Sequence, residues 1–375
     1  MNHQTFEPIE NSSSWYGADF ETDKSWEYHL EPGHIADLEQ ALHGVKRSGL
    51  ELAALGPRDF LLPTLSPVLT SLGGDLRNGR GFALLRGFPV DGYDVEDLSV
   101  MYYGLCRHIG MGMTQNSDGG LIHYVTDGAL KPNQGKRGVG FPRITPLHVD
   151  LMDIVTLLCV RQAADNPHSH LSSSTTLYNE FLNRRPDLLP RLFAGYEWDR
   201  MDEHGVGETP TSGYRVPLFS LANSALSCRY NRSWMSATHV AEKAPLSPLD
   251  EEAFKLIDDI AAETSLSFSF GKGDIQFCNN YTVLHGREAH EVEPLEERKR
   301  LLIRIWLNVP EFREFSDEAV VRYGIGYHGN LGWTAEDLLT GRHKSPRLRR
   351  DDGAIQVIAY GKGCNLHLLH AQLCS

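Results

Sequence analysis

The segment Thr145-Pro-Leu-His148-Val-Asp150, followed at once by the apolar run from Leu151 to Val160, decides how the chain is interpreted. On an extended strand, side chains two positions apart lie on the same face. One imidazole and one carboxylate on one face provide two ligands of an iron or zinc site, so a third ligand must come from elsewhere. The segment therefore predicts part of a metal site.

A third ligand is available much later, in the segment Asn279-Asn-Tyr-Thr-Val-Leu-His285-Gly-Arg287. Two histidines and one carboxylate, with coordination positions left over, form the facial triad of non-haem Fe(II) oxygenases. A lone His-x-Asp carries little weight, because a chain with 17 histidines contains some by chance. The prediction of a metal site at His148, Asp150 and His285 therefore depends on the segments around it.

Composition limits the classes of function. The chain has 375 residues, 41% hydrophobic and 23% charged, as in an ordinary soluble globular protein. Its net charge of −13 argues against a nucleic-acid or anionic-membrane partner. Residues 1–14 lack the apolar stretch of a secretory signal, and no uncharged apolar run reaches the ~18 residues of a membrane span. We expect a cytoplasmic protein with a small-molecule partner and buried, reduced cysteines, and a homo-oligomeric state stays open.

The hydrophobic pattern predicts helices over 34–48, 65–77, 94–106 and 248–263, and short strands after residue 80. Residues 165–176 have the composition of a turn. Because strands outnumber helices after residue 80, a mainly β jelly roll or barrel with flanking helices is favoured. We expect an arm and helices over 1–80, a catalytic core over 81–310 and an extension over 311–375, in all one catalytic domain.

Four features together resemble the taurine dioxygenase (TauD/TfdA) family over roughly residues 81–310. They are His148-x-Asp150, the distal His285, the pair Arg300-x-x-x-Arg304, and the early strand Gly81-Phe-Ala-Leu-Leu-Arg-Gly87. The resemblance implies a double-stranded β-helix of the cupin-like type, with Fe(II), the co-substrate 2-oxoglutarate and O₂. It also argues against halogenation, since the halogenating relatives lack the carboxylate that Asp150 supplies.

The same resemblance assigns roles to single residues. His148, Asp150 and His285 would bind iron, and Arg300 would hold the far carboxylate of 2-oxoglutarate. Thr176, with Thr175 as a close rival, matches the threonine that binds the same carboxylate. However, the family's Gly-Gly-type turn before that threonine is replaced here by residues 167–174, Pro-His-Ser-His-Leu-Ser-Ser-Ser.

Arg304 matches the position that binds the anionic group of the substrate. Spacing alone cannot tell Arg304 from Arg300, because residues four apart on a strand share a face. Arg304 lies within Leu-Leu-Ile-Arg-Ile-Trp-Leu, where an unpaired charge would be costly. We expect it to be buried and functional.

The sequence therefore predicts an oxygenase that oxidises an unactivated C–H bond of a small, carboxylate-bearing, amino-acid-derived substrate, by hydroxylation, desaturation or oxidative cyclisation. A role in specialised metabolism would suit such a tailoring enzyme. The substrate would be bound by Arg304 with Thr114, Gln115 and Asn116, under a loop over 128–140. Two alternatives are a zinc hydrolase with the same ligands, which needs no Arg300, and a non-catalytic β-barrel binding protein, which needs no metal.

Overall fold

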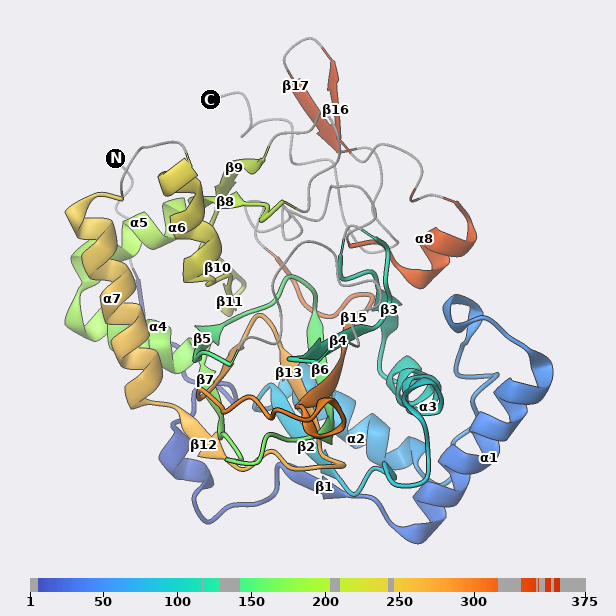
Figure 1. The fold of residues 1–375 in the computed structure, drawn as a ribbon. Helices are drawn as coiled ribbons and strands as arrows, with labels where there is room; N and C mark the ends of the chain where they lie inside the picture. Colours follow the sequence, from blue (N-terminus) through green and yellow to red (C-terminus); the bar gives the residue numbers. More distant parts are fainter. Residues whose placement is uncertain are drawn as a thin grey trace.

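Two β-sheets form the centre of the molecule (Figure 1). The computed structural model describes residues 6–116, 118–128, 142–202, 210–241, 246–315, 332–341, 343, 348–351 and 354–357. The larger sheet has the order β1-β2-β13-β6-β15-β3, and β4 also pairs with β15. Its strands are β1 (Glu27–His29), β2 (Phe82–Arg86), β3 (Met111–Met113), β4 (His123–Thr126), β6 (Ile154–Arg161), β13 (Ile275–Asn279) and β15 (Leu301–Asn308).

The smaller sheet has the order β12-β7-β14-β5. Its strands are β5 (Thr145–His148), β7 (Ser169–Ser173), β12 (Leu266–Phe268) and β14 (Val283–Arg287). Val155 from the larger sheet and Leu171 and Val283 from the smaller one belong to the same buried cluster. The two sheets therefore share one hydrophobic core.

Strand β15 shows how the larger sheet separates two cores. Leu302 and Trp306 belong to the cluster shared with the smaller sheet, whereas Ile303 and Ile305 belong to a second cluster on the opposite face. This alternation follows from the two-residue period of a strand. The second cluster includes the apolar sides of three helices, α1 (Pro32–Ser48), α2 (Ser66–Asn78) and α3 (Val95–Arg107).

The chain between β7 and β12 forms a large insertion, which lies on the other side of the molecule from α1 (Figure 1). Helices α4 and α7 of this insertion contact the smaller sheet. The insertion comprises α4 (Ser174–Arg184), α5 (Leu189–Ala194), α6 (Arg232–Ala241), α7 (Pro248–Glu263) and the hairpins β8 (Tyr196–Asp199) with β9 (Thr211–Val216) and β10 (Phe219–Ala222) with β11 (Ala225–Cys228). The remaining elements are the 3₁₀ helices η1 (Gly17–Phe20), η2 (Leu52–Ala54), η3 (Pro186–Leu188) and η4 (Glu296–Arg298), with α8 (Ala335–Leu339), β16 (Leu348–Asp351) and β17 (Ala354–Val357).

One element departs from the sequence-based expectation. The composition of residues 165–176 predicts a turn, but they contain β7 and the first residues of α4. Strand β7 is rich in serine and histidine, yet it pairs with β12 on one side and β14 on the other. Backbone pairing within the sheet, rather than an apolar pattern, therefore determines its structure.

Other expectations agree with the structure or lie outside it. Helix α7 has the predicted bounds, and the four described cysteines are buried and free. In the described part of the chain, no helix is both long and apolar enough to cross a membrane. Apart from Gly128, the loop expected to close over the substrate lies outside the described residues.

Asp153 ties the start of β6 to two other segments, and its removal should destabilise the fold. The carboxylate is fully buried and accepts bonds from Tyr281 Oη at 2.6 Å, Asn308 Nδ2 at 2.9 Å and the Val309 amide at 2.8 Å. Asp153→Ala should lower the free energy of unfolding by about 3 kcal/mol or more, because charged hydrogen bonds are lost and donors are left unpaired. Urea unfolding measures this. Asp91→Ala is the matched control, since that side chain is 89% exposed. Equal stability of the two variants would contradict this role.

Candidate metal centre

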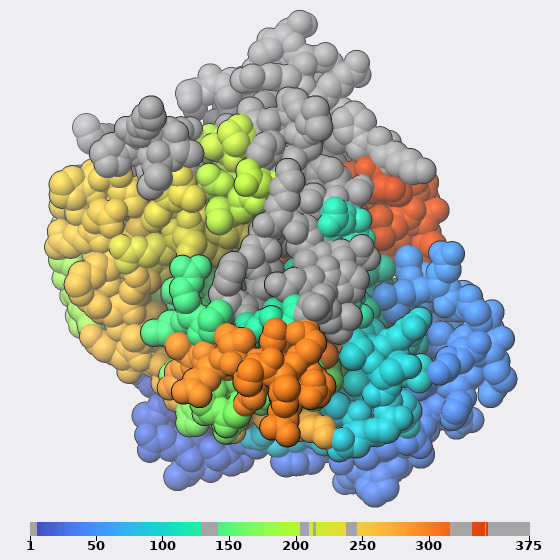
Figure 2. Space-filling model, viewed as in Figure 1, coloured from blue at the N-terminus to red at the C-terminus, as the bar shows by residue number. Residues whose placement is uncertain are grey.

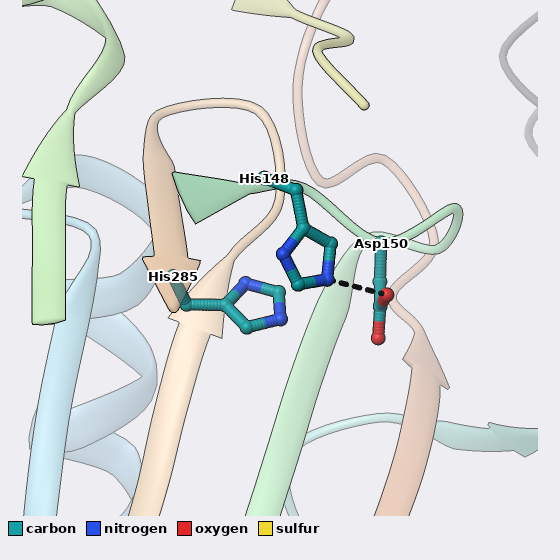
Figure 3. A group of neighbouring side chains, drawn as sticks. All are labelled: His148, Asp150 and His285. Carbon is teal, nitrogen blue, oxygen red and sulfur yellow. Dashed lines mark ion pairs between the residues drawn. The ribbon is translucent and has the colours of Figure 1, made fainter. Parts of the chain in front are cut away.

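The three predicted ligands meet between the sheets (Figure 3). His148 is the last residue of β5 and pairs with His285 on β14. Asp150 follows in the loop before β6, so its place does not come from a continuous strand. One possible ligand atom from each of the three residues lies within 4.8 Å of the others. Within the described residues, this is the group of histidine, cysteine and acidic side chains that could hold a metal ion.

The loop at Asp150 is fixed through its backbone. Asn280 Oδ1 accepts the Asp150 amide at 3.0 Å, and Arg229 Nη1 donates to the Asp150 carbonyl at 3.1 Å. The Val149 amide donates to the Tyr230 carbonyl at 2.9 Å. These bonds bring the carboxylate beside His148, with Asp150 Oδ1 3.6 Å from His148 Nε2.

Both imidazoles can offer a lone pair. His148 Nδ1 lies 2.8 Å from the Pro146 carbonyl, and a proton on that nitrogen leaves Nε2 free to bind a metal. The His285 ring lies 4.4 Å from the His148 ring, centre to centre. Burial and the neighbouring His148 lower the pKa of His285 to about 3, so this ring is neutral near pH 7.

The carboxylate of Asp150 is ionised although it is only 6% exposed. Burial alone would raise its pKa, but the charge of Arg304 and the interactions with His148 and His285 hold the pKa well below its usual range. Asp150 Oδ2 accepts Trp306 Nε1 at 2.7 Å and lies 3.4 Å from Arg304 Nη1. The other oxygen, Oδ1, faces His148.

These donors fit an Fe(II) ion. The set is two imidazoles and one ionised carboxylate, the ligands of the facial triad. His285 Nδ1 is buried and has no hydrogen-bond partner among the described residues. An unsatisfied buried nitrogen beside a carboxylate is costly in a purely structural cluster, so the geometry favours a metal site.

Arg300 lies just before β15 and is 4% exposed. Its Nε donates to Gln162 Oε1 at 2.8 Å, and it forms no ion pair within the described part of the chain. Burial and the nearby Arg287 lower the pKa of Arg300 to about 10. A buried cation without a counter-ion is costly, so this position suits an anionic ligand.

A histidine–aspartate pair lies near Arg300. The segment 288–299 lies mostly on the surface (orange in Figure 2), but His290 within it is buried. Its Nε2 is 2.6 Å from Asp127 Oδ2. Burial lowers the pKa of both Arg287 and Arg300, and the negative charge of Asp127 opposes that shift, so Asp127 attracts both arginines. The exposed Asp165 also acts on both arginines, so Asp127 is the buried carboxylate of this group and Asp165 the exposed one.

Arg304 lies on β15, four residues after Arg300, and beside the three predicted ligands. Its Nε donates to Gln115 Oε1 at 2.8 Å, and its guanidinium lies 4.7 Å from the centre of the Trp306 ring. Gln115 also donates to the Arg304 carbonyl at 2.8 Å. Gln115 therefore orients the side chain of Arg304.

The two neighbours of Gln115 are held by hydrogen bonds of their own. Thr114 Oγ1 accepts the Trp333 amide at 2.8 Å, and Asn116 Oδ1 accepts the amides of Asp118 and Gly120. All three residues of this segment are fully buried. The segment 114–116 is therefore held in place beside Arg304.

Thr176 has a different neighbourhood from the one expected. Its hydroxyl donates to the Trp15 carbonyl at 2.8 Å, and Thr175 Oγ1 lies 2.7 Å from Ser13 Oγ. Both threonines belong to α4, beyond the end of β7 at Ser173. The structure does not bring them to Arg300.

Ser169, at the other end of β7, is better placed. It pairs with Arg287, while Leu171 pairs with His285, so Ser169 lies on the same face of the sheet as the metal ligand. It is buried and lies on the Arg287 side, toward Arg300. Sequence analysis misses Ser169 because the composition of residues 165–176 predicts a turn.

Trp306 is also missed, although a signal is present. It follows Arg304 by two positions, and on a strand that spacing puts both side chains on one face. An indole N–H is a donor only, which suits the ionised carboxylate of Asp150.

Comparison with known proteins identifies a family and two relatives. The family described as "Taurine catabolism dioxygenase TauD, TfdA family" matches residues 47–306. The chain is 29% identical to FR-33289 synthase of Streptomyces rubellomurinus, over 82% of this chain and 92% of that protein. It is also 29% identical to the taurine hydroxylase-like protein SAT17 of Stachybotrys chartarum, over 79% of each.

Solved structures share the fold at low sequence identity. An asparagine oxygenase in complex with Fe(II), 2S,3S-3-hydroxyasparagine and succinate superposes with a TM-score of 0.57 at 14% identity, over 76% of this chain and 93% of that one. The non-heme iron oxygenase OrfP in complex with Fe and α-ketoglutaric acid superposes with a TM-score of 0.53 at 15% identity, over 75% and 93%.

Burial of a neutral His285 should make the metal-free protein sensitive to acid. Its pKa is about 3 in the folded state and 6.5 for an unperturbed histidine, so below about pH 6.5 the unfolded chain binds a proton that the folded chain does not. Stability should fall with decreasing pH by up to about 1.4 kcal/mol per pH unit from this group. Urea unfolding in chelator between pH 6.5 and about pH 4.5, above the titration of Asp150, measures the slope.

His285→Gln should show a smaller slope than the wild type in that window. His43→Gln, which removes an exposed histidine of α1, is the matched control. An unchanged slope in His285→Gln would show that the buried ring is not the cause.

Proposed function

The chain belongs to the TauD/TfdA family and is an Fe(II)- and 2-oxoglutarate-dependent dioxygenase, and we propose that it oxidises an unactivated C–H bond of a small, carboxylate-bearing, amino-acid-derived substrate. In this proposal His148, Asp150 and His285 hold the iron, and the two sheets form a double-stranded β-helix. Iron with 2-oxoglutarate and O₂ would supply the oxidising chemistry, coupled to decarboxylation of 2-oxoglutarate. The protein binds and orients both organic molecules.

Arg300 would bind the far carboxylate of 2-oxoglutarate. It is a buried cation without an ion-pair partner among the described residues, and Gln162 fixes its Nε. A guanidinium can bind a carboxylate through two parallel hydrogen bonds. We infer that Ser169, rather than Thr176, donates the additional hydroxyl, because Thr176 is bonded to Trp15.

Arg304 would bind the anionic group of the substrate. The observation that supports this role most strongly is its position: it is 8% exposed, held by Gln115, and close to Asp150. A substrate anion bound there would lie next to the iron site. The amino-acid class agrees with two proteins of the same fold, an asparagine oxygenase and OrfP, which has been crystallised with L-Arg.

A zinc hydrolase would use the same three ligands with a metal-bound water. It would give no role to the buried charge of Arg300. The oxygenase explains both the ligands and the arginine, and is the function that the site supports best.

Release of succinate from 2-oxoglutarate with added Fe(II), over a panel of amino acids and their derivatives, tests this function. Arg300→Ala should weaken 2-oxoglutarate binding by about 2–5 kcal/mol, because one partner of a buried charge pair is removed. Ser169→Ala should cost less, about 1 kcal/mol, the usual value of a neutral hydrogen bond. Calorimetric titration of the metal-loaded protein measures both.

Arg298→Ala is the control, because that arginine is exposed and lies two residues from Arg300. Unchanged 2-oxoglutarate affinity in Arg300→Ala, with a loss in Arg304→Ala, would exchange the roles of the two arginines. Absence of succinate release with every compound of a broad panel would count against the oxygenase.

Arg304→Gln should raise the KM for the substrate steeply, with a much smaller change in 2-oxoglutarate affinity. Loss of the guanidinium leaves the substrate anion without its buried partner, which costs about 2–5 kcal/mol. Steady-state kinetics with the best compound of the panel provide the measurement. The methyl ester of that compound should be a poor substrate for the wild type, and an ester turned over as well as the free acid would refute the role of Arg304.

A further inference from the structure

The two oxygens of the Asp150 carboxylate are in different environments. Oδ1 faces His148 Nε2 at 3.6 Å (Figure 3). Oδ2 accepts the indole N–H of Trp306 at 2.7 Å and lies 3.4 Å from Arg304 Nη1. Oδ1 is therefore the oxygen that faces a second proposed ligand, His148.

We propose that Trp306 is a positioning residue that holds Asp150 Oδ2 away from the metal, so that Asp150 binds through one oxygen only. This inference rests on the proposed function, since it assumes iron at His148, Asp150 and His285. It assigns a role to a residue that touches neither substrate nor metal.

The backbone on both sides of the carboxylate is already fixed. Asn280 accepts the Asp150 amide, and Arg229 donates to the Asp150 carbonyl. The remaining freedom of Asp150 is rotation of its side chain, which would exchange Oδ1 and Oδ2 or bring both toward the metal. The hydrogen bond from Trp306 restricts that rotation.

Trp306 is better suited to this task than Arg304. Its bond is short, whereas the contact of Arg304 is at the long limit of a hydrogen bond. Arg304 is also bound by Gln115 and, in the proposed function, must bind the substrate anion. A donor that is shared with a ligand cannot hold Oδ2 throughout turnover.

The indole is itself held rigidly. Trp306 is fully buried in the middle of the larger sheet, where its backbone pairs with Val155 on β6 and Met113 on β3. Because the indole is neutral, it orients the carboxylate without cancelling the negative charge that attracts the metal. Arg304, as a cation, would reduce that attraction.

The restriction has a chemical purpose. A facial triad leaves the remaining positions of the metal open, and 2-oxoglutarate and O₂ must share them. A carboxylate can bind a metal through one oxygen or two, and the second oxygen would occupy a position that the co-substrates need. Loss of the Trp306 bond should weaken metal binding, because Asp150 is then no longer oriented. It should also weaken 2-oxoglutarate binding, because the second oxygen can then occupy a position that the co-substrate needs.

Trp306→Phe removes the N–H and keeps an aromatic ring, and Co(II) binding under anaerobic conditions is the measurement. The Kd for Co(II) should rise about 10- to 100-fold, the usual effect of removing a residue that orients a metal ligand. The increase in Tm caused by Co(II) should shrink accordingly, whatever happens to the Tm of the metal-free protein. At saturating Co(II), 2-oxoglutarate should bind more weakly than to the wild type.

Trp198→Phe is the matched control, because Trp198 is equally buried, lies on β8, and its Nε1 has no hydrogen-bond partner in the described part of the chain. It should leave the Kd for Co(II) unchanged. Arg304→Gln removes a cation that reduces the attraction for the metal, so it should not raise the Kd as Trp306→Phe does. A Trp306→Phe protein whose Kd stays within about two-fold of the wild type, or is lower than that of Arg304→Gln, would overturn the proposal.

His285→Ala separates this inference from the proposed function. If the wild type fails to bind Co(II), or His285→Ala binds it equally well, the metal site itself is wrong. If His285→Ala loses Co(II) while Trp306→Phe retains full affinity for both Co(II) and 2-oxoglutarate, only the role of Trp306 is rejected.

Discussion

The ionised carboxylate of Asp150, buried between two sheets, is the constraint on which the site depends. A buried charge needs partners, and those partners come from distant parts of the chain. Trp306 and Arg304 bind one oxygen from the larger sheet, and His148 faces the other from the smaller sheet. The ionised carboxylate can therefore be buried without a large energetic cost only when both sheets are in place, so the site depends on the complete fold.

Strand β15 supplies two of the partners that stabilise the Asp150 carboxylate. Its inward positions hold Arg304 and Trp306, and its outward positions, Ile303 and Ile305, pack on the helices. A slip of one residue in the pairing with β6 would turn Arg304 into the apolar layer of the helices. Two interactions therefore specify the register of β15: the cost of burying the Arg304 charge in that layer, and the hydrogen bond from Trp306 to Asp150.

The sequence was sufficient to predict those features that residue types and hydrophobic periodicity determine locally. The proximity of His148, Asp150 and His285 and the burial of Arg304 followed from residue types and spacing, and the bounds of α7 followed from its apolar period and its acidic start. It was insufficient where tertiary contacts decide. Strand β7 has a polar sequence and pairs with β12 and β14, and its polar pattern left Ser169 out of the sequence-based prediction. No local pattern states which strand will lie beside another.

The charges inside the site also bear on the substrate. Arg304 and Asp150 form an ion pair, so their charges partly offset each other, and Arg287 and Arg300 both face Asp127 and Asp165. In the proposed function, the two charges of Fe(II) would be offset by the two charges of 2-oxoglutarate. A substrate anion next to Arg304 would gain from the guanidinium at short range, whereas the long-range field of a chain with a net charge of −13 would repel it. Affinity for such a substrate must therefore come from contacts inside the site and not from attraction at a distance.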